Sequence, residues 1–181
     1  MSMSEKLAGT ALALALLAGG ASLSEQGARY GLGRKISERD LAAWDIDVRP
    51  DGAGLPPGRG SVPQGREIYL AKCSACHGES GEGSPMDRLV GGQGTLATAK
   101  PVKTIGSYWP YATTLFDYLR RTMPFTAPQT LGNDEVYALT AYLLSLNGII
   151  AKDAVLDAKT LPRVEMPNRK NFVPDPRPDV K

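Results

Sequence analysis

One pentapeptide constrains this chain more than any other feature, and it reads Cys73-Ser74-Ala75-Cys76-His77. The chain has 181 residues with two cysteines and one histidine, and all three lie within these five positions. Two thiols three positions apart can each add to one vinyl group of a porphyrin, and the next histidine can bind the iron. The pentapeptide therefore predicts one covalent haem, with Cys73 and Cys76 as anchors and His77 as an axial ligand.

Three other uses of these residues fit the sequence less well. A zinc site needs four ligands, usually with a second Cys or His pair far from the first, and the sequence has no such pair. A thioredoxin-like redox pair would stand beside a βαβ pattern, but no strand periodicity surrounds the cysteines. A structural disulfide would leave the single, adjacent histidine without a role.

The composition argues against several other classes of protein. Basic and acidic residues number 21 and 19, so the overall charge gives no reason to expect a nucleic acid or another acidic polymer as partner. We recognise no pair of catalytic carboxylates, no nucleophile with its base, and no phosphate-binding loop. The 20 glycines and 14 prolines indicate long irregular segments, and a haem would supply the centre of a small core.

The N-terminal residues favour export from the cytoplasm. Leu7 to Ser24 form an uncharged run, rich in alanine and leucine, directly after Lys6. This pattern is typical of a secretory signal peptide. The run is also about long enough to cross a bilayer, which takes about 18 to 20 residues. We expect residues 1–24 to be a signal peptide, with a retained membrane anchor as the alternative, and the remainder to be periplasmic.

The rest of the chain divides into an arm, a haem domain and a tail. Residues 25–60 are expected to form an extended N-terminal arm, with one short helix over 37–44 that opens on a capping box. Within this arm, Trp44 is expected to pack against the domain. Residues 61–148 are predicted to be the haem domain. The proline-rich tail, 149–181, is expected to lie extended on the surface or on a partner.

Three helices are predicted within the haem domain. The first begins with a capping box at Ser61 and runs to Lys72. The second covers 111–122 and stops before a proline. The third has apolar residues at helical spacing between a cap at 132 or 133 and a stop at Asn147. Residues 78–107 are predicted to be a long loop over the porphyrin.

The second axial ligand has several candidates in the sequence: Met86, Met123, Met166, a lysine, or no protein group. Met123 is favoured because it closes a helix before Pro124 and lies far enough after His77 for the chain to wrap round the porphyrin. The alternative is that Met123 only packs in the core. A thioether opposite imidazole favours ferrous iron and fills the last position, so this arrangement predicts electron transfer without substrate binding.

Two further groups of side chains are candidates for the haem surroundings. Tyr108 and Trp109 precede the second helix, and their polar groups are candidate partners of the haem propionates, with simple packing as the alternative. Five basic residues are candidates to surround the exposed haem edge and attract an acidic partner, or else to form an ordinary solvated surface. They are Lys72, Lys100, Lys103, Arg120 and Arg121.

The pentapeptide, the Met123-Pro124 pair and the three flanking helices resemble a class I cytochrome c. The resemblance implies an all-α fold, with about three core helices around one covalent haem c and extended arms at both ends. In that family the first and last helices cross at a small residue flanked by aromatic rings. Gly65, Tyr69 and Tyr142 are placed for this crossing.

Segments outside these motifs resemble cytochromes that accompany molybdenum sulfite or sulfane dehydrogenases. They are residues 43–50, 106–110 and 166–169, and the resemblance extends over roughly residues 30 to 180. Some sulfane dehydrogenase cytochromes carry two haems. Because this chain can hold only one, it resembles more closely a single-haem sulfite dehydrogenase subunit or a shortened relative of the two-haem cytochromes.

This second resemblance implies an electron-transfer subunit, not a catalyst by itself. It would accept single electrons from a molybdenum subunit and pass them to a soluble cytochrome or an oxidase. Two alternatives stay open at this point. One is a general periplasmic electron shuttle for another dehydrogenase or an oxidase. The other is a haem enzyme or gas sensor, which requires that Met123 does not bind iron.

Overall fold

The computed structural model describes residues 32–177, and the predicted leader at Leu7 to Ser24 lies outside this range. The chain divides into two compact units, Met1–Leu41 and Ala42–Lys181, and each is described by itself. Within residues 32–177, no helix combines the length and the apolar character that a membrane span requires.

The predicted short helix in the N-terminal arm is α2 (Glu38–Ala42), which is shorter than expected. It begins with the predicted capping box, since the Ser37 and Asp40 side chains each accept a hydrogen bond from the other residue's amide. The prediction that Trp44 packs against the domain is wrong, because its side chain is 83% exposed. Val48 is the buried residue of this stretch, and the chain joins the core there instead.

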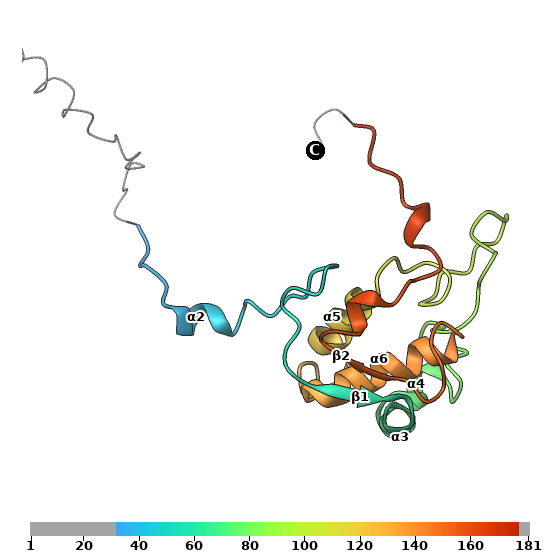
Figure 1. Cartoon of the computed structure of the whole chain (residues 1–181), viewed down its shortest axis with the longest axis horizontal. Helices are drawn as coiled ribbons and strands as arrows, with labels where there is room; N and C mark the ends of the chain where they lie inside the picture. The colour runs from blue at the N-terminus through green and yellow to red at the C-terminus, as the bar shows by residue number, and fades with distance from the viewer. Residues whose placement is uncertain (1–31, 178–181) are drawn as a thin grey trace, which may run out of the picture. The chain divides into compact units, whose positions relative to one another are not determined.

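The three predicted core helices are present. They are α3 (Val62–Lys72), α5 (Ala112–Thr122) and α6 (Asn133–Leu146), with the short α4 (Ser74–His77) after α3. Helix α6 is the centre of the core: it packs against both α3 and α5 (Figure 1), and every residue from Val136 to Leu144 is buried. Because α6 is apolar on nearly all sides, it can form only inside such a packing.

Helices α3 and α6 cross where the resemblance to class I cytochromes implies. Gly65 lies directly against the backbone of Ala138, and a Cβ atom at this position would overlap the Ala138 carbonyl. Beside this contact the rings of Tyr69 and Tyr142 lie 5.3 Å apart in a tilted arrangement. The small residue lets the two backbones approach, and the aromatic pair fills the space next to them.

The prediction of an all-α fold is incomplete, because the mostly helical domain also contains a small sheet. Strand β1 (Arg59–Ser61) pairs antiparallel with β2 (Val155–Asp157), and Gly60 lies opposite Leu156. Each strand has three residues, too few to show the alternating pattern by which a strand is recognised in a sequence. The sheet joins the start of the haem domain to the tail.

Much of the C-terminal tail belongs to the core, in contrast to the expected extended conformation on a surface or partner. After β2 the chain forms two short 3-10 turns, η1 (Leu161–Arg163) and η2 (Arg169–Asn171). Leu161 and Met166 are buried in the hydrophobic core, and Met166 is only 3% exposed. Residues 172–177 have no regular structure and are exposed.

The part of the N-terminal arm next to the domain is hydrogen-bonded to α5 and α6. Side chains on these helices bind its backbone: Asp117 accepts from the Val48 amide, Arg120 donates to the Ile46 carbonyl, and Tyr137 donates to the Pro56 carbonyl. A segment with many prolines and glycines cannot form its own backbone ladder, so these side chains satisfy its polar groups.

Candidate haem-binding site

The two cysteines lie where α3 ends and α4 begins. The amide of Cys73 still donates to the Tyr69 carbonyl of α3 at 2.8 Å, while Cys76 lies within α4. Both are free thiols; Cys73 is partly buried and Cys76 exposed. Burial raises the pKa of the Cys73 thiol to about 11. Two reduced thiols on one short turn fit the covalent attachment of a porphyrin.

His77 is oriented by a backbone group. Its Nδ1 lies 2.9 Å from the carbonyl oxygen of Asp87. A carbonyl oxygen can only accept a hydrogen bond, so Nδ1 carries the proton and donates it. The lone pair of Nε2 is then free for a metal, and a hydrogen bond of this kind makes the imidazole a stronger ligand. The donor set therefore fits an iron ligand at His77.

The turn after His77 is held by a dense set of hydrogen bonds. The Met86 amide donates to the Cys76 carbonyl and the Gly83 amide to the His77 carbonyl, both at 2.9 Å. The Tyr69 hydroxyl donates to the Gly78 carbonyl at 2.7 Å. These bonds hold the turn on α3 and α4. The turn beside the imidazole should therefore open only at a high free energy.

Asn147 is a structural residue of the site that sequence reasoning recognised only as a helix stop. Its buried side chain accepts from the Gly91 amide and donates to the Leu89 carbonyl, at 3.1 and 3.2 Å. It also donates to the Leu143 carbonyl of α6 at 2.9 Å. The available signal was a polar amide directly after the most apolar helix of the chain.

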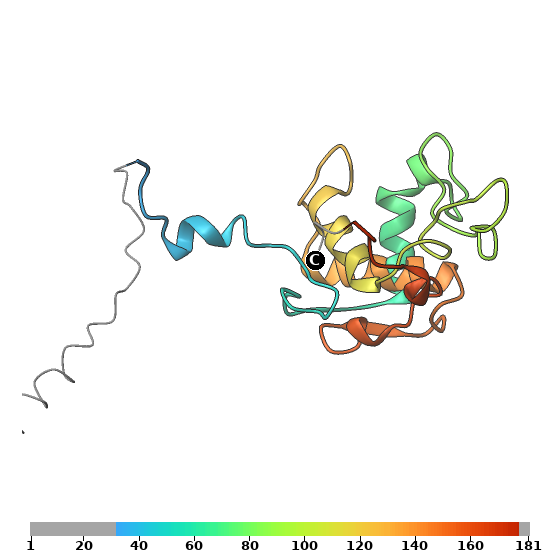
Figure 2. The ribbon, with the colours of Figure 1, turned by 90° about the horizontal axis from the view of Figure 1, so that it is seen from above.

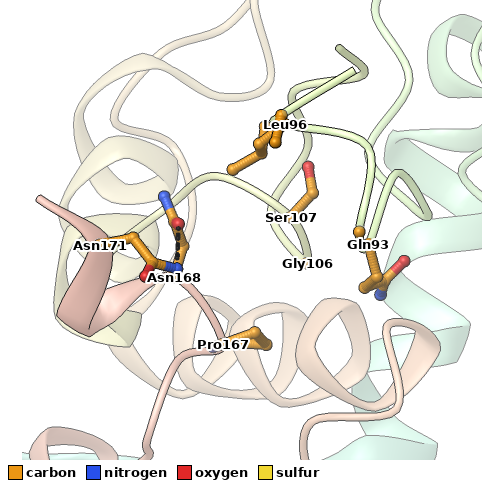
Figure 3. Close-up of a pocket in the computed structure, with 9 residues that line it drawn as sticks. Gln93, Leu96, Gly106, Ser107, Pro167, Asn168 and Asn171 are labelled. Atoms are coloured by element: carbon orange, nitrogen blue, oxygen red, sulfur yellow. Dashed lines mark hydrogen bonds between the residues drawn. The ribbon is translucent and has the colours of Figure 1, made fainter.

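A pocket of about 230 Å³ lies farther along the same long loop. Figure 3 shows Leu96 and Ser107 from the loop facing Pro167, Asn168 and Asn171 from the tail. The Asn171 amide donates to Asn168 Oδ1 at 3.0 Å. No residue of the Cys73–His77 pentapeptide lines this pocket, which is a contact zone of the loop and the tail.

The three candidate methionines occupy different settings. Met123 follows α5 in an extended conformation and packs, partly buried, against the core. Met166 is enclosed in the core, and Met86 is 52% exposed with its amide bonded to Cys76. In Figure 2 the loops that follow α4 (green) and α5 (ochre) project from the same side of the domain. The choice of Met123 as an iron ligand stays a prediction.

Tyr108 and Trp109 are both packed against aromatic rings. Tyr108 lies 5.6 Å from the ring of Phe172, and Trp109 meets the ring of Tyr118 edge-on at the same centroid distance. Within residues 32–177, neither the Tyr108 hydroxyl nor the Trp109 ring nitrogen bonds to another group. Their role at the haem propionates stays a prediction.

Of the five basic residues expected around the haem edge, three have partners within the chain. They are Lys72 with Glu135 at 2.6 Å, Arg121 with Asp117 at 2.6 Å, and Arg120 with the Ile46 carbonyl at 3.0 Å. Lys103 lies over the Tyr108 ring at 5.1 Å from its centroid. Within the described range, Lys100 alone of the five has no such contact.

The comparisons with known proteins agree with this geometry. The sequence model of the Cytochrome c family matches residues 62–147. A crystal structure of the sulfane dehydrogenase SoxCD from Paracoccus pantotrophus contains a chain 46% identical to this one, with a TM-score of 0.78. The match covers 82% of this chain and 74% of that chain. The chain belongs to the cytochrome c family.

Family membership confirms the predicted cofactor. This cytochrome binds one covalent haem c with its iron, and it is an electron-transfer haem protein. It also resembles the cytochrome subunit of sulfane dehydrogenase, as predicted from its sequence. The zinc, disulfide and thioredoxin-like alternatives for the two cysteines are thereby excluded.

Proposed function

We propose that this cytochrome is the electron-accepting subunit of a periplasmic molybdenum enzyme that oxidises sulfite or sulfane sulfur. The observation that carries the proposal is the 46% identity to a chain of SoxCD over 82% of this chain. That match covers more of the chain than residues 62–147, the part common to the cytochrome c family. Segments beyond the general haem domain are therefore shared with a protein of that complex.

We assign the haem ligands to four residues. Cys73 and Cys76 would hold the porphyrin through thioether bonds, and His77 and Met123 would bind the iron. When bound, the haem supplies a one-electron ferrous–ferric couple. The Asp87 carbonyl holds the proton of His77 on Nδ1, which keeps Nε2 directed to the metal.

We infer that the apolar core on α5 and α6 forms part of the haem surroundings. Leu115, Leu139 and Leu143 are buried on α5 and α6. An apolar surrounding penalises the extra charge of ferric iron, and a neutral thioether ligand has the same effect. Together these groups favour the ferrous state, so the cytochrome would accept electrons readily from a donor of lower potential.

The stoichiometry requires two successive transfers. Oxidation of sulfite with water to sulfate releases two electrons and two protons. One haem accepts one electron, so it must pass this electron to an acceptor before it takes the second. The acceptor would be a soluble cytochrome or an oxidase, and the catalytic step itself would occur on the partner subunit.

Reduction of the haem by a sulfur compound tests this function. Purified, oxidised cytochrome is mixed with periplasmic extract of the source cells, sulfite or a sulfane compound is added, and haem reduction is followed optically. A matched extract comes from cells grown with tungstate in place of molybdate. We expect reduction that requires both the sulfur compound and the molybdenum-grown extract. A haem that dithionite reduces but the sulfur compounds do not would refute the assignment.

A further inference from the structure

Asn147 ties the loop beside His77 to the central helix. Its side chain bonds Leu89 and Gly91 in the loop and the Leu143 carbonyl in α6. Its own carbonyl accepts from the Gln93 amide group at 3.3 Å. Buried amides with all hydrogen bonds made are rigid, because each lost bond leaves an unsatisfied polar group. Asn147 thus joins the loop at Leu89 and Gly91 to α6, the most buried helix.

The same loop segment carries the acceptor for the His77 proton. Asp87 lies two residues before Leu89, and its carbonyl receives the Nδ1 hydrogen of His77. On its other side, the segment is bonded to the turn after His77, where the amides of Leu89 and Val90 both donate to the Gly81 carbonyl. Those bonds connect the segment to the turn alone, whereas the bonds of Asn147 connect it to α6.

The surroundings leave the Asn147 amide little freedom. Gly106 packs so closely that a Cβ atom there would overlap the Asn147 side chain. The Thr104 hydroxyl bonds the Gly91 carbonyl, which holds the same segment from the next part of the loop. The 87–91 segment is therefore held by the turn at Gly81, by Thr104 and by Asn147, and of these Asn147 is the one bonded to α6.

We propose that Asn147 is a positioning residue for His77: it fixes the segment whose Asp87 carbonyl holds the imidazole proton. This inference rests on the proposed role of His77 as an iron ligand. A carbonyl held firmly at Nδ1 keeps the ring oriented and raises the basicity of Nε2. Release of the segment would lengthen that hydrogen bond and change the iron's reduction potential, although Asn147 itself lies outside the ligand set.

The test compares two buried polar residues of the same helical region in the haem-loaded protein. Asn147→Ala removes the side-chain bonds to Leu89, Gly91 and Leu143 and keeps the backbone bond to Gln93. Thr140→Val is the matched control, because Thr140 is also buried but its hydroxyl bonds only the Val136 carbonyl within α6. Two quantities are measured: the exchange rate of the His77 Nδ1 proton in the ferrous protein by NMR, and the reduction potential.

We expect Asn147→Ala to speed exchange of the Nδ1 proton on the order of tenfold and to shift the potential. Thr140→Val should lower stability but leave both quantities at their original values. The proposal is overturned if Asn147→Ala changes neither quantity, or if Thr140→Val changes both to the same extent, since the effect would then be general loosening.

The unaltered protein supplies a second test that does not depend on how well a variant folds. In it the Gly91 amide should exchange slowly with solvent, because it is bonded to buried Asn147. Exchange as fast as that of an exposed amide would overturn the proposal. Failure of the underlying assignment gives a different result. If His77 does not bind the iron, the haem spectrum of the unaltered protein would lack the features of a histidine ligand, while the Gly91 amide would still exchange slowly.

Discussion

The His77 side and the Met123 side of the site are built in different ways. The turn at residues 78–91 is bonded to α3, α4 and α6 by side chains and backbone groups from distant parts of the chain. The Met123 loop, residues 123–131, contains only local bonds within the described residues, such as that from the Ala127 amide to the Pro124 carbonyl. Its Phe125 side chain is 81% exposed.

The two sides differ in how many long-range contacts hold them in place. Around His77 the protein holds the imidazole and the Asp87 carbonyl that accepts its proton in place through long-range contacts. Around Met123 it provides a helix end and a short loop. Elements with few long-range bonds open at the lowest free energy. Of the two proposed iron ligands, Met123 should therefore be more easily displaced than His77.

The largest expected effect comes from removal of Met123, the proposed second iron ligand. Met123→Ala should leave the haem covalently attached but lower the reduction potential by a sizeable share of the roughly 0.8 V that axial ligands span. The ferrous form should also bind carbon monoxide, which the unaltered protein should not. Met86→Ala is the matched control and should change neither property. If Met123→Ala keeps the original potential, Met123 is a packing residue.

A smaller effect is expected in the rates of amide hydrogen exchange, which should differ between the His77 side and the Met123 loop. The amides of Gly83 and Met86 are bonded next to His77, whereas those of Phe125 and Thr126 bond to no other described residue. In the haem-loaded protein, we expect the first pair to exchange on the order of a hundredfold more slowly than the second. Equal rates, measured by NMR, would contradict the contrast between the two sides.

The smallest effect concerns Tyr69, whose hydroxyl bonds the Gly78 carbonyl on the His77 side. Burial raises the pKa of Tyr69 to about 12, from about 10 in an unfolded chain. Its contribution to stability is thus fully present below pH 10 and is lost as the pH rises through about 12. Tyr69→Phe should cost about 1 kcal/mol at pH 7, and this difference should shrink above pH 10.

Urea unfolding of the haem-loaded protein at several pH values measures this difference. Tyr137→Phe serves as the control, since burial also raises the pKa of Tyr137 to about 12, but its hydroxyl bonds Pro56 in the N-terminal arm. Both variants should show the same pH trend. Only Tyr69→Phe should speed exchange of the Gly83 amide, and a matching change in Tyr137→Phe would contradict a local role for Tyr69.

The sequence was sufficient for the elements that depend on neighbouring residues. The capping box at Ser61 and the apolar repeat of α6 predicted helices that the structure contains. Gly65 was placed correctly at the helix crossing by family resemblance. The strands β1 and β2 were missed, because three residues carry no periodic signal and their pairing joins positions almost a hundred residues apart.

The roles of single polar side chains were hardest to predict. Asn147 reads as a helix stop, and only its contacts with Leu89 and Gly91 show that it holds the loop. Likewise Lys72 and Arg121 look like free surface cations until their acidic partners on the folded chain are seen. A hydrogen bond or ion pair between distant residues leaves no pattern in a single sequence.

The sequence by itself determined the cofactor and the local structure of this cytochrome: one covalent haem c, for which Cys73, Cys76 and His77 are the proposed residues, and three core helices. These follow from residue type, spacing and capping, all of which act within a few positions. The tertiary structure decided that the tail enters the core at Met166, that Trp44 stays exposed, and that α6 holds the His77 loop. These outcomes depend on which distant surfaces pack and which polar groups they satisfy, and that is settled only when the chain folds.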